Sequence, residues 1–214
     1  MKTLCVIPAR YNSNRYPGKC LKEVMGKPVL QHVIERCCQA VTLDEVVVAI
    51  PKNDSSYPLK EWLKSKNVRF EEPKVAENNV LARIIAVAEE YRPKHIVRVN
   101  GDCPLIHPNM IDEAVLQMRL WAQSKDPPDY VGYRFGDVPS VLTKYGAPEV
   151  FTRQILSLWG TIPEHVTVAA YCSCNPHWIK IEGEPIHTVV DLPRDLATIE
   201  YRMKELDCNS EIST

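Results

Sequence analysis

Over the first 128 residues, the pattern of apolar and polar positions predicts strands and helices in alternation. Short apolar runs typical of buried strands cover residues 4–7, 45–50, 68–70 and 95–99. Between these runs, apolar residues recur every three or four positions, which predicts helices over residues 28–40, 59–66, 78–91 and 107–124. Such an alternation is typical of a parallel sheet with right-handed crossovers, in which ligands bind beyond the carboxyl ends of the strands.

After Pro127 and Pro128 the pattern is less regular. It predicts strands at residues 129–133, 177–181 and 188–190, the second of them antiparallel. Helical periodicity predicts helices over residues 148–159, 164–171 and 193–206. A chain of 214 residues is expected to form one domain, in which we distinguish parts of about 1–128, 129–190 and 191–206.

A polar, cationic loop follows the first predicted strand. Five cations and one acid lie between Arg10 and Lys27, whereas the whole chain has a formal net charge of −1. A positive loop at the carboxyl end of a strand suggests a local polyphosphate site. For the charges alone, a solvated loop is an equally good explanation, because charged residues mostly lie on the surface.

Two aspartates, far apart in the sequence, each follow a predicted strand. Asp102 comes after residues 95–99 and Asp191 after residues 188–190. Carboxylate oxygens are ligands that Mg²⁺ prefers, so the two could form a magnesium pair at one edge of the sheet. Taken singly, each aspartate is more simply explained as a turn residue.

The composition excludes several classes of protein. Apolar residues make up 45% of the chain and charged residues 25%, as in ordinary globular proteins. The balanced charge disfavours a nucleic-acid partner, and no apolar run approaches the roughly 20 residues that cross a bilayer. The first residues lack the pattern of a signal peptide. We therefore expect a cytoplasmic protein with no nucleic-acid or membrane partner.

The eight cysteines form no CxxC pair. Without a secretory signal, reduced and mostly buried thiols are the better interpretation. A metal site at Cys172, Cys174 and His177 is disfavoured, because known zinc sites have other spacings.

Several motifs resemble those of the cytidylyltransferases that activate ulosonic and nonulosonic acids, and of the SpsF-like proteins of spore-coat polysaccharide. They occur in the family's order and are Pro8-Ala9-Arg10 with Ser13-x-Arg15-x-Pro17-Gly18-Lys19, Asn79-Val80-Leu81-Ala82-Arg83, Gly101-Asp102-Cys103-Pro104-Leu105-Ile106, Glu164-His165-Val166-Thr167 and Val190-Asp191-Leu192-Pro193. The chain departs from the SpsF-like pattern at Tyr11-Asn12, where Met-Gly is usual, and residues 146–151 match the family only loosely.

The resemblance implies an α/β fold, a Rossmann-like three-layer α/β/α sandwich of the nucleotide-diphospho-sugar transferase type. Its sheet would be mostly parallel, with a small antiparallel subregion that binds the sugar and forms a homodimer. The implied reaction joins CTP and a sugar, of acidic or keto type, into a CMP-sugar and pyrophosphate, with Mg²⁺ as cofactor.

The resemblance also implies roles for particular residues. The catalytic residues would be Arg10, Arg15 and Lys19, which hold the triphosphate. Further nucleotide contacts would come from Pro8, Ala9, Ser13, Asn79, Arg83 and Asp102. Asp102 and Asp191 would hold Mg²⁺, and Glu149 and His165 would contact the sugar. Asn79 could equally be a helix cap and His165 a structural histidine.

Three alternatives stay open. A nucleotidyltransferase of the same fold could use GTP or UTP. A glycosyltransferase could bind a ready-made nucleotide sugar, although that class normally has an Asp-x-Asp motif and here Cys103 and Pro104 follow Asp102. A non-catalytic nucleotide-binding protein is the third.

Overall fold

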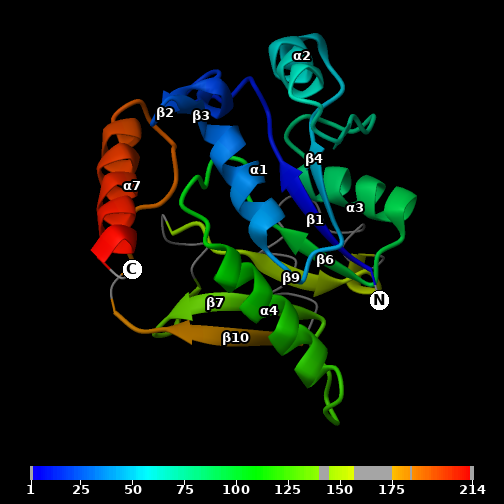
Figure 1. The fold of residues 1–214 in the computed structure, drawn as a ribbon. Helices are drawn as coiled ribbons and strands as arrows, with labels where there is room; N and C mark the ends of the chain where they lie inside the picture. Colours follow the sequence, from blue (N-terminus) through cyan, green and yellow to red (C-terminus); the bar gives the residue numbers. More distant parts are fainter. Residues whose placement is uncertain (1, 140–144, 157–174, 184, 213–214) are drawn as a thin grey trace.

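Figure 1 shows the fold of the computed structural model, which describes residues 2–139, 145–156, 175–183 and 185–212. The strands are β1 (Thr3–Pro8), β2 (Glu23–Val24), β3 (Lys27–Pro28), β4 (Glu45–Ala49), β5 (Phe70–Glu71), β6 (His95–Arg98), β7 (Tyr130–Phe135), β8 (Val138–Pro139), β9 (Glu149–Thr152) and β10 (Pro176–Ile181). The α-helices are α1 (Val29–Gln39), α2 (Tyr57–Ser65), α3 (Val80–Tyr91), α4 (Pro108–Trp121) and α7 (Asp195–Ile212), and the 3-10 helices are η1 (Lys19–Leu21) and η2 (Asp54–Ser56).

Within these ranges, eight strands form one sheet in the order β10-β7-β9-β6-β1-β4-β5, with β8 paired to β7 outside this path. Strand β1 is parallel to both of its neighbours, β4 and β6, and β4 is parallel to β5. Strand β9 runs antiparallel to β6 and β7, whereas β10 is parallel to β7. The predicted fold class, an α/β sandwich with a mostly parallel sheet, is confirmed.

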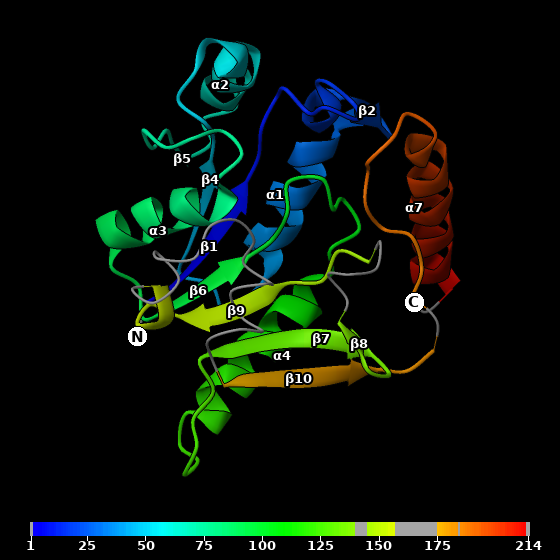
Figure 2. The same cartoon turned by 180° about the vertical axis from the view of Figure 1, so that it is seen from behind.

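Helices cover both faces of the sheet. Because alternate residues of a strand point to opposite faces, Cys5 and Ile7 join a core cluster with residues of α1, α2 and α4. Leu4 and Val6 join a second cluster with residues of α3. Figures 1 and 2 show α1 and α4 on one face and α3 on the other.

The helix boundaries follow local signals. Asn79 caps α3, because its Oδ1 accepts a hydrogen bond from the Ala82 N–H at 2.8 Å. His107 caps α4, because its Nδ1 accepts from the Asn109 N–H at 3.2 Å. Helix α1 begins at Val29, so Pro28 is its N-cap rather than part of its first turn.

A short antiparallel hairpin, β2–β3, lies within the cationic loop and was not predicted. Its turn residues Met25 and Gly26 have φ of 50° and 72°, the positive values that favour two-residue hairpins. Val24 packs in a third cluster with Val29, Val190 and residues of α7. The hairpin therefore packs the loop against the last helix, α7, which Figure 1 shows beside it.

Three predictions of secondary structure were wrong. Residues 149–152 form strand β9 rather than the start of a helix over 148–159, because this segment pairs with both β6 and β7. Strand β10 is parallel, not antiparallel, to its neighbour, since alternation alone does not set direction. Residues 188–190 form no strand. The helix predicted over 164–171 lies outside the described residues.

The structure identifies five cysteines as free thiols, Cys5, Cys20, Cys37, Cys38 and Cys103. Four are buried and Cys38 is exposed, as predicted for reduced thiols. Cys172 and Cys174 lie outside the described residues, so the disfavoured metal site there stays untested. None of the helices described is both long enough and apolar enough to cross a bilayer.

Candidate active site

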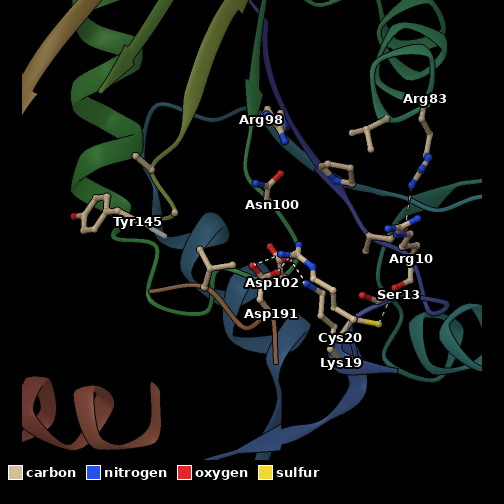
Figure 3. Close-up of a pocket in the computed structure, with 18 residues that line it drawn as sticks. Arg10, Ser13, Lys19, Cys20, Arg83, Arg98, Asn100, Asp102, Tyr145 and Asp191 are labelled. Carbon is tan, nitrogen blue, oxygen red and sulfur yellow. Dashed lines mark hydrogen bonds and ion pairs between the residues drawn. The ribbon is translucent and has the colours of Figure 1, made fainter. Parts of the chain in front are cut away.

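A cavity of about 320 Å³ opens at the carboxyl ends of β1 and β6, where a parallel sheet is expected to bind its ligand. Two segments approach closely there, because Gly101 lacks a side chain: a Cβ would lie 3.0 Å from Ala9 Cβ and 3.2 Å from the Pro8 carbonyl oxygen. Figure 3 shows the side chains that converge on this cavity. The residues that line the cavity are Pro8, Ala9, Arg10, Ser13, Arg15, Lys19, Cys20, Val80, Arg83, Arg98, Asn100, Gly101, Asp102, Tyr145, Gly146, Ala147, Val189 and Asp191.

Lys19 lies at the centre of a buried ion cluster. Its Nζ donates to Asp102 Oδ2 at 2.5 Å, to the Val190 carbonyl at 2.8 Å and to Asp191 Oδ1 at 3.1 Å. Arg15 binds the same Asp191 carboxylate with two nitrogens, at 2.8 and 2.9 Å. Residues 176 positions apart in the sequence therefore meet at one point. Lys19 and Asp102 meet as the strand-end argument predicted, whereas Asp191 follows residues 188–190, which form no strand.

The charges in this cluster set the protonation of Lys19. Burial by itself lowers the pKa of Lys19, but the negative charges of Asp102 and Asp191, together with hydrogen bonds to them, outweigh burial and raise it. The ammonium group is therefore charged at neutral pH. Cys20, beside it, is different: burial raises the pKa of its thiol to about 12, so it is no nucleophile at neutral pH.

Backbone hydrogen bonds hold Asp191 in position. The Asp195 side chain, at the start of α7, reaches back to the residues before the helix, where its Oδ2 accepts from the N–H groups of Asp191 and Leu192, both at 2.8 Å. The Val190 N–H donates to the Asp102 carbonyl at 2.8 Å. The two aspartates are thus connected through the main chain as well as through Lys19.

A second pair of cations, Arg10 and Arg83, lies toward α3, away from the aspartates (Figure 3). Arg83 is buried, and its guanidinium donates to the carbonyls of Ala9 at 3.2 Å and Glu77 at 2.6 Å. Burial and the nearby Arg10 lower the pKa of Arg83 to about 10, which leaves it charged at pH 7. Arg10 donates to Asn78 Oδ1 at 2.7 Å. Both guanidiniums border the cavity.

Arg98 forms the inner wall of the cavity near Asn100 (Figure 3). Its Nη1 pairs with Glu149 Oε2, across the β6–β9 register, and Tyr130 donates its hydroxyl to Glu149 Oε1 at 2.7 Å. The Nε of Arg98 is buried and has no partner among the residues described. Because an unpaired buried donor is costly, this guanidinium retains unused capacity to bind an anion.

Most of the predicted site residues are brought together. Nine of them border the cavity: Pro8, Ala9, Arg10, Ser13, Arg15, Lys19, Arg83, Asp102 and Asp191. Asn79 is not among the lining residues, and its side chain serves as the helix cap. Glu149 is only 3% exposed, and both of its carboxylate oxygens are engaged, so it supports Arg98 instead of facing the cavity. His165 lies outside the described residues.

Sequence reasoning missed several residues of the cavity wall. Arg98 could have been found, because a cation inside the apolar run of residues 96–99 is unusual in a buried strand. Asn100 follows at the same strand end and could have been included for that reason. Tyr145 comes from a segment without clear periodicity, and no signal in the sequence pointed to it. Gly146 and Ala147 belong to residues 146–151, which match the family loosely, but neither was named as a site residue.

The ion cluster fits a hard divalent cation. The three atoms that surround the Lys19 ammonium are all oxygens, from two carboxylates and one carbonyl, the ligand type that Mg²⁺ prefers. In the described part of the chain, no group of three or more His, Cys, Asp or Glu side chains could hold a metal. An ion bound by Asp102 and Asp191 would thus complete its shell with phosphate oxygens and water.

Comparisons with known proteins agree with this geometry. The family model described as cytidylyltransferase matches residues 4–132. The 3-deoxy-manno-octulosonate cytidylyltransferase of Geobacter metallireducens is 41% identical over 115 residues, 54% of this chain and 44% of that protein. The enzyme of the same name from Syntrophotalea carbinolica is 36% identical over 127 residues, 59% and 47% of the two chains. The alignments thus span less than half the length of these relatives.

Solved structures show the same fold over nearly the whole chain. The CMP:2-keto-3-deoxy-manno-octonic acid synthetase complexed with CTP superposes with a TM-score of 0.75 and 19% identity, and covers 96% of this chain and 99% of its own. A cytidylyltransferase from Leptospira borgpetersenii gives a TM-score of 0.73 and 22% identity over 94% of this chain and 85% of its own. At these identities the likeness shows the fold alone.

Proposed function

Because the chain belongs to the cytidylyltransferase family, we propose that it transfers CMP from CTP to a hydroxyl group of a sugar and releases pyrophosphate. The observation that carries the proposal is the convergence of Arg15 and Lys19 with Asp102 and Asp191 in one cavity. The cations suit a triphosphate and the carboxylates suit its magnesium ion. Five cations and two acids border the cavity, which favours a polyanionic ligand.

Positioning and charge neutralisation are the main tasks of the protein in this reaction. The sugar oxygen forms a bond to the α-phosphorus, and the bond to the pyrophosphate oxygen breaks. Arg10, Arg15 and Lys19 bind the triphosphate and stabilise the negative charge that grows on the leaving pyrophosphate. Each is charged at neutral pH, so none needs to gain a proton first.

Asp102 and Asp191 would hold the magnesium ion. When bound there, the ion polarises the α-phosphate and lowers the pKa of an attacking hydroxyl. The two aspartates are fixed to each other through the Val190 main chain, which would keep their separation constant during the reaction.

We place the base of the nucleotide at the other end of the cavity, near Arg83. Arg83 lies against Ala9 there, and Pro8 and Ser13 also line the cavity. The carbonyl of Ala9 already accepts a hydrogen bond from Arg83, so Arg83 can shape the pocket through the main chain as well as by direct contact. We do not assign Asn79 to base recognition, because its side chain caps helix α3.

The sugar would lie beside Arg98, Asn100 and Tyr145. An acidic keto sugar is favoured by the position of Arg98 in the cavity wall, with its Nε unpaired among the described residues, since a guanidinium binds carboxylates well. It is also favoured by the names of the relatives from Geobacter metallireducens and Syntrophotalea carbinolica. Glu149 acts in this proposal by holding Arg98. His165 stays a predicted sugar contact.

The test is a panel of four triphosphates with Mg²⁺ and a set of keto-acid and amino sugars, read by pyrophosphate release and product mass. We expect release with CTP and a product that is one CMP group heavier than the acidic sugar. A preference for GTP or UTP would favour the other nucleotidyltransferases of this fold. No release with any pair would favour a non-catalytic protein.

We also propose a homodimer formed through the region of about residues 130–185. Among the strands that the structure describes, β10 of this region lies at the edge of the sheet, and an edge strand offers unpaired backbone groups to another chain. Light scattering at micromolar concentration tests it, and a monomer there would contradict it. The cytoplasmic location stays a prediction as well.

A further inference from the structure

The Lys19 ammonium lies between the two aspartates and binds one oxygen of each carboxylate. An ammonium group has three donors, and Lys19 directs them at Asp102, Val190 and Asp191, at 2.5 to 3.1 Å. The residue is 8% exposed. Both oxygens of Asp191 and one oxygen of Asp102 are therefore already bound to a positive charge.

The cluster is also electrically neutral without a metal. Two carboxylates, of Asp102 and Asp191, face two cations, of Arg15 and Lys19. A dication that approached these carboxylates would meet the Lys19 ammonium at close range, and it would gain little attraction from a pair already neutralised. The cluster as it stands favours exclusion of a metal ion.

The Lys19 side chain is able to move away from Asp102 and Asp191. Lysine carries a compact charge on a flexible four-carbon stem, and a triphosphate offers oxygens that are equally good partners for an ammonium group. The Arg15 side chain is 65% exposed, so little packing opposes its movement toward a phosphate. Both cations would exchange carboxylates for phosphates when the nucleotide binds.

We propose that Lys19 closes the metal position in the nucleotide-free protein and that the triphosphate opens it by withdrawing Lys19 from Asp102 and Asp191. Metal and nucleotide then bind cooperatively, and each raises the affinity for the other by the same factor. The proposal rests on the proposed function, since it assumes that a nucleoside triphosphate enters this cavity.

The experiment measures Mn²⁺ binding to the full chain by the loss of the free-ion electron paramagnetic resonance signal. The nucleotide-free wild type is expected to bind Mn²⁺ about tenfold or more weakly than Lys19→Met, in line with common coupling factors. Lys19→Arg keeps a cation at this position and should bind as weakly as the wild type. Lys22→Met is the matched control, because Lys22 is exposed and lies outside the cavity.

Two further measurements locate the effect and guard against misfolding. In Lys19→Met with Asp102→Asn, the gained Mn²⁺ binding should disappear if the ion binds at this cluster. Thermal melts follow folding, and Mn²⁺ should raise the melting temperature of Lys19→Met but not of the nucleotide-free wild type. Should Lys19→Met not fold, Arg15→Met is measured instead, and it should raise the Mn²⁺ affinity of the free protein.

The outcomes separate this proposal from the function on which it rests. A wild type that binds Mn²⁺ equally well with and without CTP overturns the closure by Lys19 but leaves nucleotidyl transfer intact. Lys19→Met that binds no better than the wild type overturns it too. A wild type that forms no complex with CTP and Mn²⁺ together overturns both.

Discussion

Strand β6 carries a buried ionisable side chain at each end, His95 and Arg98. The surroundings of the two side chains favour opposite charge states. At the amino end, His95 is 1% exposed, and neither ring nitrogen has a partner among the described residues. Burial, with Lys94 and Arg119 nearby, lowers the pKa of His95 to about 4. At the carboxyl end, Arg98 is 5% exposed and pairs with Glu149. His95 is therefore neutral at pH 7, whereas Arg98 is a charged member of an ion pair.

The difference shows why the chemistry lies at the carboxyl end. Burial of a charge requires partners, and at this end the loops and β9 supply them from distant parts of the chain, including Asp102, Asp191 and Glu149. The same end opens into the cavity. At the amino end no carboxylate is paired with His95 among the described residues, so the only stable form of that side chain is the uncharged one.

The largest effect should come from removal of the partner of Arg98. Glu149→Leu leaves a buried guanidinium unpaired, and the free energy of unfolding should fall by about 3–5 kcal/mol, measured by urea denaturation. The double variant Arg98→Met with Glu149→Leu removes both charges and should recover most of this loss. Equal stability of Glu149→Leu and the wild type would contradict the claim that the buried charge of Arg98 depends on Glu149.

Asp102→Asn should affect the reaction rather than the fold. The substitution removes a carboxylate that would hold Mg²⁺, and pyrophosphate release should fall by about a hundredfold to a thousandfold, as when a charge-stabilising group is lost. Circular dichroism melts should show a folded domain. Full activity in this variant would remove Asp102 from the metal site.

His95 should make stability depend on pH. The unfolded chain takes up a proton near pH 6.5, but the folded protein takes it up only near pH 4. Stability from the neutral side chain is therefore complete above pH 6.5 and should be lost as pH falls toward 4, by about 2–3 kcal/mol. The free energy of unfolding of His95→Phe should fall less steeply over this range, and parallel curves for the two proteins would contradict the account.

The smallest effect concerns the hydroxyl group that supports Glu149. Tyr130→Phe removes one hydrogen bond, at 2.7 Å in the wild type, but leaves the ion pair with Arg98 in place. The unfolding free energy should fall by about 1 kcal/mol. A loss as large as that of Glu149→Leu would mean that the hydroxyl, rather than the ion pair, controls this end of the strand.

The elements near the amino terminus could be predicted from the sequence because local signals and tertiary packing agree there. The strand of residues 4–7 and the helix capped by Asn79 are examples. The meeting of Lys19 and Asp102 followed from one rule, that loops at the carboxyl ends of parallel strands lie at the same edge of a sheet. The position of Asp191 did not follow from it, because residues 188–190 form no strand.

The later part of the chain could not be predicted in this way. Residues 149–152 are a strand because β6 and β7 provide partners on both sides, and a single sequence does not reveal those partners. The same holds for the direction of β10. Glu149 was expected to contact the sugar, but its pairing with Arg98 depends on the β6–β9 register, which no local pattern sets.

A crystal structure of the chain with CTP and Mn²⁺ tests the central claim most directly. The account predicts one nucleotide in the cavity, with Arg15 and Lys19 at hydrogen-bonding distance from its phosphates and the ion on Asp102 and Asp191. Nucleotide bound elsewhere, with Lys19 still joined to both aspartates, would contradict it.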